Sequence, residues 1–179
     1  VGSLTASMFH LMTHAFFKAL LFLCAGAVIE AMHEEADIFK MGGLKERMPV
    51  TFRCMTIGVL AIAGVPPLAG FFSKDAILAA AAEVSIPLYI IAVLTAFMTA
   101  FYMARLLFVA FFGEVRPGCP AQETNAYMKW PLIVLAALSV VSGLWGHVYD
   151  FEEWVRFGPV AKEEIDWMIA GTSTVLTIV

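Results

Sequence analysis

Charged residues are scarce in this chain of 179 residues: 15% are Asp, Glu, Lys or Arg, whereas 61% are hydrophobic. A soluble globular domain has about half apolar and about a quarter charged residues. The net charge of −4 is small and includes no block of like charge, so it does not indicate a nucleic-acid partner. This composition favours a protein whose surface faces lipid.

Sequence patterns that bind cofactors are also missing. The chain has no glycine-rich phosphate loop, no dinucleotide-binding fingerprint and no cysteine set for an iron–sulfur cluster. Its cysteines, Cys24, Cys54 and Cys119, are odd in number and far apart, which fits neither a disulfide framework nor a zinc site. We expect them to be small core residues. We expect the chain itself to hold no cofactor or metal and to have no catalytic residue.

Long apolar runs, in contrast, are abundant. Four of them match or exceed the roughly 20 residues that a helix needs to cross a bilayer, and a fifth, the last, is shorter. They span about residues 4–29, 50–82, 86–112, 130–149 and 165–179. The sequence therefore predicts an all-α fold, a polytopic transmembrane helical bundle. Because the chain does not begin with Met and is still apolar at its end, we expect it to be an internal piece of a longer protein.

The second run is interrupted. It contains Pro66 and Pro67, flanked by Gly64 and Gly70, and a proline pair removes backbone donors and breaks a helix. Its length is too great for one straight crossing and too small for two. We predict a discontinuous helix, two half-helices joined by unwound backbone, of the kind that marks ion paths in transporters. The alternative is a simple proline kink.

Titratable residues recur inside the first run. His10, His14 and Lys18 stand four residues apart, and on a helix a step of four turns a side chain by only ~40° and rises ~6 Å. The three therefore form a ladder on one face. Each ionisable group at membrane depth costs on the order of 2.5–3.5 kcal/mol, which indicates a function such as a proton relay. The alternatives are histidines that only brace helix contacts and a lysine that snorkels to the interface.

The second half-helix carries a further ionisable pair. Lys74 is the second candidate proton carrier, and Asp75 follows it directly. On a helix, adjacent residues point about 100° apart, so we expect Asp75 to pair with another element.

Charge also differs between the loops. If the broken run is one crossing, loops 31–49 and 113–129 share a side, and they carry Lys40, Lys45, Arg47, Arg116 and Lys129. The positive-inside rule places this side in the cytoplasm or its organellar equivalent.

Four stretches of the sequence resemble a known family. They are HLMTHAFFKALLFLCAGAVI, DIFKMGGLKERMPVTF, IGVLAIAGVPPLAGFFSKDAIL and LTAFMTAFYMARLLFVAFFG. Together they closely resemble subunit L, an antiporter-like membrane subunit of the proton-pumping NADH:quinone oxidoreductase (respiratory complex I). The lysine before aspartate in GFFSKD is more similar to subunit L than to its sister subunits, in which an acidic residue is usual at the lysine position.

The resemblance implies a division of the chain and a set of roles. Residues 1–113 would form the second part of an antiporter-like inverted repeat, and residues 114–179 the following transmembrane helices, the last of them truncated. His10, His14 and Lys18 would belong to a hydrophilic axis that conducts protons, with Lys74 near the proton exit. The chain would be a non-redox subunit in a bacterial or organellar inner membrane. Other membrane subunits would be its partners, and NADH, FMN, iron–sulfur clusters and quinone would bind in partner subunits.

Three alternatives remain at this point. The large subunit of a multi-subunit Na⁺/H⁺ antiporter shares the fold and much of the first two motifs, and a related membrane hydrogenase is also similar. The third alternative is of another class, a passive membrane subunit whose polar residues only hold helices together.

Overall fold

The computed structural model describes residues 4–115, 121–148 and 171. All regular elements in these ranges are helices, which confirms the predicted fold class. They are α1 (Leu4–Ala31), the 3-10 helix η1 (Ile38–Lys40), α2 (Leu44–Arg47), α3 (Pro49–Ala63), α4 (Ala69–Val84), α5 (Ile86–Phe111) and α6 (Ala126–Val148). The fifth predicted run, residues 165–179, lies outside the described ranges except for Gly171.

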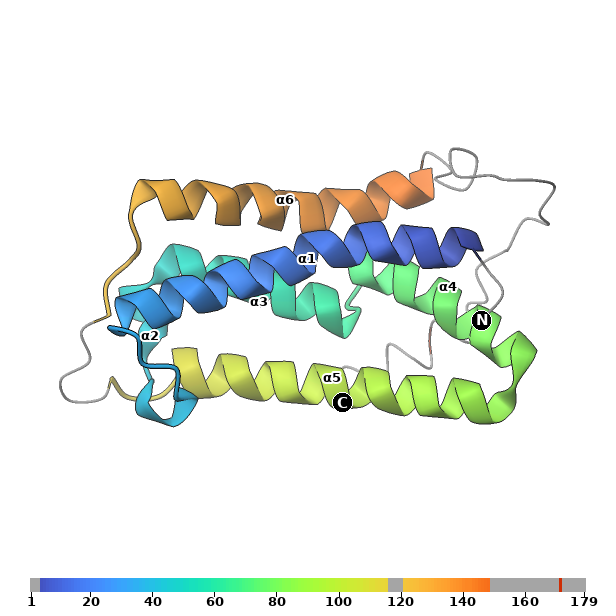
Figure 1. Ribbon diagram of the computed structural model, residues 1–179, viewed down its shortest axis with the longest axis horizontal. Coiled ribbons are helices and arrows are strands. Elements are labelled where there is room, and N and C mark those ends of the chain that lie inside the picture. Colours follow the sequence, from blue (N-terminus) through green and yellow to red (C-terminus); the bar gives the residue numbers. More distant parts are fainter. Residues whose placement is uncertain (1–3, 116–120, 149–170, 172–179) are drawn as a thin grey trace.

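The long helices form an elongated bundle (Figure 1). α1 packs against α3, α4 and α6, while α5 packs against α3 and α4. The half-helices α3 and α4 follow one another along the bundle, between α1 and α5 in this view. The break between them therefore falls within the length of the bundle and not at one of its ends.

Three of the described helices are long and apolar enough to cross a membrane: Ala6–Ala31, Ile86–Phe111 and Ala126–Gly143. α3 and α4 have 15 and 16 residues, so each is shorter than the roughly 20 residues of a full span. The outer face of α5 exposes large hydrophobic side chains, including Ile91, Met98 and Phe101. A face of this kind is suited to contact with lipid tails.

The predicted break is present. α3 ends at Ala63, and Gly64 follows in the left-handed conformation with a φ of 87°, while its N–H bonds to the Leu60 and Ala61 carbonyls. A glycine suits this position because it adopts positive φ without steric cost. Pro66 and Pro67 lie in the connection, and the helix resumes only at Ala69. The connection is thus unwound backbone between two half-helices, and not a kink in one helix.

Close packing holds the two half-helices together beside the break. A Cβ at Gly70 would collide with the carbonyl oxygen of Ala61, and one at Gly143 of α6 would lie 2.6 Å from the Ala69 Cα. Both glycines therefore allow backbones to approach closely, as small residues do at membrane helix contacts. The first turn of α4 is fixed from two sides, by α3 and by α6.

The hydrophobic core lies between α1, α3, α5 and α6. Its fully buried members include Phe17, Leu20 and Cys24 of α1 and Leu132 of α6. Cys24 and Cys54 are both free and buried, as expected for small core residues. Cys119 lies outside the described residues.

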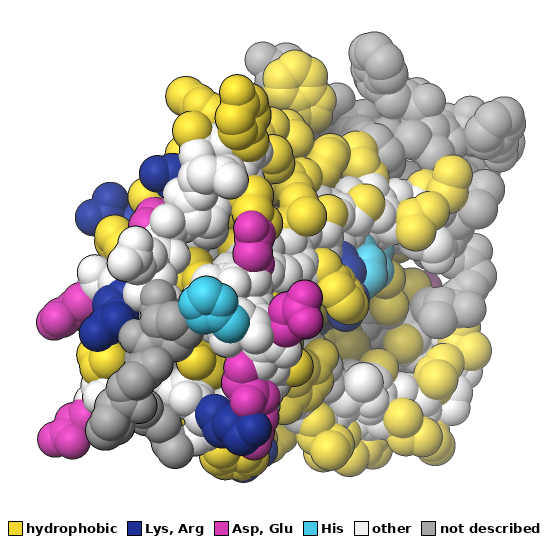
Figure 2. All heavy atoms as spheres, turned by 60° about the vertical axis from the view of Figure 1, so that its left-hand side comes forward, with side chains coloured by type: hydrophobic (Ala, Val, Ile, Leu, Met, Phe, Trp, Pro, Cys, Tyr) yellow, Lys and Arg dark blue, Asp and Glu magenta, His cyan; other side chains and the backbone are white. Residues whose placement is uncertain are grey.

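Charged side chains gather at one end of the bundle. Figure 2 brings forward the end that carries α2, and Lys, Arg, Asp and Glu side chains cluster there beside hydrophobic flanks. The described parts of loops 31–49 and 113–129 both lie at this end (Figure 1). Lys40 forms a salt bridge to Glu35 at 2.6 Å there, and this pair lowers the pKa of Glu35 and raises the pKa of Lys40.

Candidate functional site

The titratable ladder of α1 lies on one face of the helix. The rings of His10 and His14 are tilted neighbours with their centroids 5.6 Å apart, and both residues are half-buried. Lys18 continues the series one turn later, with its Nζ 5.3 Å from the centre of the Phe22 ring on the same helix. The geometry is that of a row of ionisable groups along one face of α1, in which His10 contacts α4 and Lys18 contacts Phe22 of its own helix.

Ser73 joins this row to α4. Its Oγ lies 3.1 Å from His10 Nδ1 and accepts a hydrogen bond from Thr13 Oγ1 at 3.0 Å. Both Ser73 and Thr13 are fully buried. Neither residue stands out in the sequence; the only hint is that Ser73 directly precedes Lys74.

Lys74 spans the helix break. Its Nζ donates to the Ile62 carbonyl at 2.8 Å and to the Ala63 carbonyl at 3.1 Å. The last carbonyls of a helix have no partner within the helix, and a lysine near that end also interacts favourably with the helix dipole. The Lys74 side chain passes beside Gly64, where a Cβ would stand at an ordinary contact distance of 3.5 Å from the Lys74 Nζ. Lys74 of α4 therefore caps the C-terminus of α3.

The remaining predicted residues differ in their surroundings. Asp75 is buried on α4 and is close enough to Lys74 for electrostatic attraction. Pro66 and Pro67 are exposed in the connection, while Gly64 and Gly70 are buried. The structure thus brings His10, Ser73 and Lys74 to one region beside the break, and Lys18 lies farther along α1.

Glu123, which the sequence analysis did not single out, caps the opposite end of α3. Its Oε2 accepts from the Val50 N–H at 2.6 Å, and its Oε1 accepts from the Thr51 hydroxyl at 2.8 Å. A carboxylate is favourable at a helix N-terminus because it satisfies free N–H groups and complements the dipole. No local sequence pattern predicts this cap, because Glu123 lies in the segment before α6, far from α3 in the sequence.

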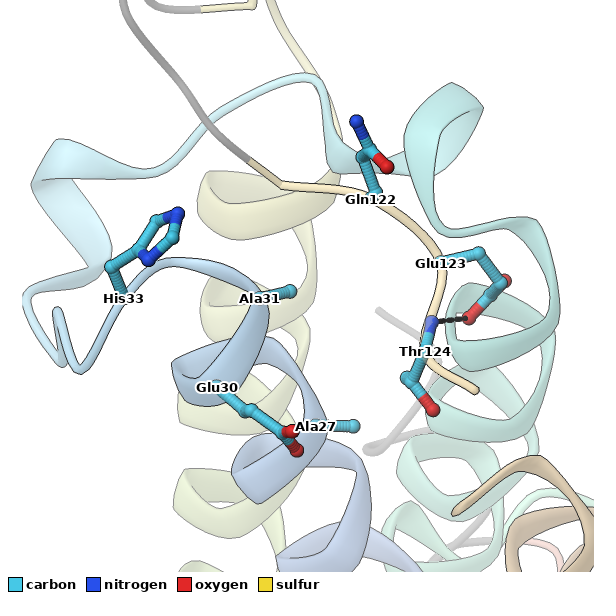
Figure 3. Close-up of a pocket in the computed structure, with 7 residues that line it drawn as sticks. All are labelled: Ala27, Glu30, Ala31, His33, Gln122, Glu123 and Thr124. Carbon is cyan, nitrogen blue, oxygen red and sulfur yellow. Dashed lines mark hydrogen bonds between the residues drawn. The ribbon is translucent and has the colours of Figure 1, made fainter. Parts of the chain in front are cut away.

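An open cavity of about 380 Å³ lies beside this cap. Figure 3 shows its lining from the end of α1 and from the segment before α6, with Glu30 and Glu123 on different sides and a bond from the Thr124 N–H to the Glu123 carboxylate. In the part of the chain that the structure describes, no group of three or more His, Cys, Asp or Glu residues is arranged to hold a metal.

Comparison with known proteins decides the family. Residues 1–99 match the family described as NADH:quinone oxidoreductase/Mrp antiporter, TM. The chain belongs to this family. The resemblance carried by the four sequence stretches is therefore confirmed, and the long apolar helices are those of an integral membrane protein.

Curated members of the family are similar over most of this chain. NADH-quinone oxidoreductase subunit L of Mycobacterium tuberculosis (strain ATCC 25618 / H37Rv) is 52% identical over 143 residues, which cover 76% of this chain and 23% of that protein. NAD(P)H-quinone oxidoreductase chain 5 of Picosynechococcus sp. is 41% identical over 184 residues, covering 84% of this chain and 28% of the relative. The chain thus spans about a quarter of the length of these relatives.

Two solved structures of membrane complexes share the fold. A chain of the archaeal membrane-bound sulfane sulfur reductase superimposes with a TM-score of 0.80 at 27% identity, over 90% of this chain and 27% of that one. A chain of the Mrp complex from Dietzia sp. superimposes with a TM-score of 0.75 at 20% identity, over 96% of this chain and 37% of that one. The family fold is therefore present in respiratory and Mrp complexes alike.

Proposed function

We propose that this chain is part of a proton-translocating membrane subunit of NADH:quinone oxidoreductase. The observation that carries the proposal is the hydrogen-bonded connection from the His10–His14 row on α1, through Ser73, to the α4 segment that bears Lys74 at the helix break. These polar groups lie on helices that are mostly apolar. Ionisable residues at membrane depth are costly, and where they occur they face the protein interior and line ion paths.

Proton movement along this region requires short steps. His10 and His14 have ring centroids 5.6 Å apart, a distance that one water molecule can bridge by hydrogen bonds to both rings. Ser142 on α6 supports a wet interior, because its buried hydroxyl has no hydrogen-bond partner among the described residues. Buried polar groups without a protein partner are typical positions for ordered water. We therefore propose a hydrated axis through His10, His14, Lys18, Lys74 and Asp75.

The driving reaction would take place outside this chain. In the proposed assembly, other membrane subunits are the partners, and the NADH, FMN, iron–sulfur and quinone sites lie in partner subunits. This chain would contribute no redox step, and its residues would take up, hold and pass on protons. The exposed hydrophobic face of α5 is available for lipid or for a neighbouring membrane subunit.

The sidedness proposal follows from charge. The end of the bundle that carries α2 holds Lys40, Lys45 and Arg47 on its surface, and basic loops favour the cytoplasmic side. We propose that this end faces the cytoplasm, or the equivalent compartment of an organelle, and that the membrane is a bacterial or organellar inner membrane. Accessibility labelling of a single cysteine introduced at Lys45 in sealed vesicles of known orientation tests it.

The decisive experiment measures proton pumping in the complete complex. The full-length subunit is altered at Lys18→Ala or Lys74→Ala, and protons translocated per NADH oxidised are counted in sealed vesicles together with quinone reduction. We expect severalfold less pumping per NADH in both variants. Lys45→Ala is the matched control, since Lys45 also lies over a phenylalanine ring, 4.9 Å from that of Phe112, but at the basic end of the bundle.

The outcomes separate the alternatives. Unaltered pumping in both variants at normal assembly contradicts the proposal and favours a passive structural subunit. Sodium-dependent transport without quinone reductase activity contradicts it in favour of a Na⁺/H⁺ antiporter, whose fold this chain shares.

A further inference from the structure

Ser73 has a complete set of hydrogen-bond partners. Its hydroxyl donates to the Ala69 carbonyl at 3.2 Å, accepts from Thr13 Oγ1 at 3.0 Å and lies 3.1 Å from His10 Nδ1. A serine hydroxyl offers one donor and two acceptor positions. The residue is fully buried, so these three partners account for all of its hydrogen-bonding capacity.

One arrangement satisfies all three partners of Ser73 at once. With its one hydroxyl hydrogen directed to Ala69, the Ser73 oxygen meets His10 with a lone pair, and the matching partner is an Nδ1 that carries the hydrogen. The hydrogen bond made by one ring nitrogen determines the state of the other nitrogen. In a neutral imidazole, an occupied Nδ1 leaves Nε2 with a free lone pair.

We propose that Ser73 is a positioning residue that holds His10 in the Nδ1–H tautomer, so that His10 takes up and releases protons through Nε2 alone. In the reverse arrangement Ser73 donates to an unprotonated Nδ1, and the Ala69 carbonyl then loses its hydrogen bond from the Ser73 hydroxyl. The neutral ring would then carry its hydrogen on Nε2, so Nε2 could not accept an incoming proton. Ser73 thus selects the form of His10 that is ready to accept a proton.

Ser73 does not itself conduct protons. Its hydrogen points to the Ala69 carbonyl, and among the described residues the acceptors within reach of the Thr13 hydrogen are Ser73, the Phe9 carbonyl and the His10 carbonyl. Backbone carbonyls accept hydrogen bonds but pass no proton on. The Thr13–Ser73 pair therefore ends in the backbone, and its effect on transport acts through the imidazole.

The orientation of the His10 ring matters for proton transfer because of the ionisable groups around it. The ionisable groups close to the ring are His14 on its own helix and Lys74 on α4. Ser73 precedes Lys74 in the chain, so the contact also ties the His10 ring to the half-helix that carries the lysine at the break. The transport part of this inference rests on the proposed function, whereas the tautomer assignment does not.

A double-mutant cycle in the complete complex tests the role. Ser73→Ala is combined with His10→Gln, and pumping per NADH oxidised is measured for each single and for the double variant. We expect Ser73→Ala to reduce pumping severalfold in the parent complex and to have no further effect once His10 is replaced, because residues that act through one group are not additive. Nitrogen NMR of the histidine-labelled complex gives the tautomer directly, with the His10→Gln spectrum identifying the His10 signals.

Ser139→Ala is the matched control. Ser139 on α6 is also fully buried and donates to the carbonyl four residues earlier, that of Leu135. The control therefore removes the same kind of buried hydroxyl and helical contact, from a side chain whose hydrogen bond is to Leu135 and not to His10. We expect it to leave both the His10 signals and the pumping unchanged.

Each result decides the inference. A change of the His10 signals toward the Nε2–H form, together with the non-additive loss of pumping, supports it. The inference is overturned if Ser73→Ala gives the same His10 signals and the same pumping as Ser139→Ala. It is also overturned if Ser73→Ala changes the tautomer without any loss of pumping. The Lys18 and Lys74 variants report separately on the proposed function, so that failure of one proposal is distinguishable from failure of the other.

Discussion

Glu123 and Lys74 cap the two ends of the same half-helix. The Glu123 carboxylate accepts from the Val50 N–H at 2.6 Å at the start of α3, and the Lys74 Nζ donates to the Ile62 carbonyl at 2.8 Å at its end. An acidic group at the N-terminus and a basic group at the C-terminus each complement the helix dipole. A half-helix of 15 residues, bounded by a loop and a break, is thereby held by residues from two other parts of the chain.

Removal of the Glu123 cap is expected to loosen the start of α3. Glu123→Ala leaves the Val50 N–H and the Thr51 hydroxyl without their partner, and loss of an N-terminal cap costs about 0.5–2 kcal/mol. We expect a lower thermal unfolding temperature of the complex and faster hydrogen exchange at residues 50–52. Glu114→Ala, at an exposed position, is the control. Equal unfolding temperatures for the two variants would contradict the prediction.

Lys74 is expected to have a structural effect separable from its role in transport. Lys74→Arg retains a cation and donors for the Ile62 and Ala63 carbonyls, whereas Lys74→Met retains only the apolar stem. Loss of a favourable charge at a helix C-terminus costs about 0.3–1 kcal/mol, rising to ~2 kcal/mol at partly buried sites. We expect Lys74→Met to be the less stable variant by about this amount in thermal unfolding. The prediction is contradicted if Lys74→Met unfolds at a higher temperature than Lys74→Arg.

Gly70 is expected to tolerate no side chain. In Gly70→Ala the new Cβ meets the Ala61 carbonyl oxygen, and this oxygen belongs to the backbone of α3, which cannot turn aside as a flexible side chain can. We expect the half-helices to separate and the subunit to assemble poorly, as measured by its yield in purified complex. Gly26→Ala on α1 is the control, because a Cβ there meets nothing within 4 Å and alanine favours a helix by about 0.5–1 kcal/mol over glycine. Normal assembly of Gly70→Ala contradicts the packing argument.

The Glu35–Lys40 salt bridge is expected to order its loop without stabilising the bundle. Lys40 lowers the pKa of Glu35, so the attraction is present at neutral pH and disappears as the pH falls through that lowered pKa. Exposed ion pairs contribute little to stability. We expect Lys40→Gln to raise the pKa of Glu35 and to speed hydrogen exchange at Asp37, whose N–H donates to Glu35 Oε1 at 3.0 Å. The unfolding temperature and the pumping should stay as in the parent, and a large loss of either contradicts the prediction.

The sequence was informative where the signal is local. The lengths of the apolar runs predicted α1, α5 and α6. The number of helical residues needed to cross a bilayer is set by the thickness of its hydrocarbon core and by the rise per residue of the helix. Pro66, Pro67 and Gly64 indicated the break for an equally local reason, the conformations that their own backbone permits. The spacing of His10 and His14 likewise placed them on one face.

The sequence did not reveal the partners of these residues. His10 and Ser73 are 63 residues apart, and Glu123 is 73 residues from Val50. Periodicity gives the face on which a side chain lies but not the group opposite, since that depends on how one helix is rotated and shifted against another. Lys74 was identified as a candidate, yet its donation to the carbonyls of α3 required the two half-helices in their packed positions.

By itself, then, the sequence determined a membrane bundle with one discontinuous helix, a row of ionisable groups on its first helix and, through its motifs, the family. Tertiary structure alone decided that Ser73 meets His10 and that Lys74 and Glu123 cap α3. The reason is physical. Helix formation and membrane burial depend on residues close together in the chain, whereas hydrogen bonds between helices depend on close approaches such as those at Gly70 and Gly143, which set the depth and rotation of each helix in the bundle.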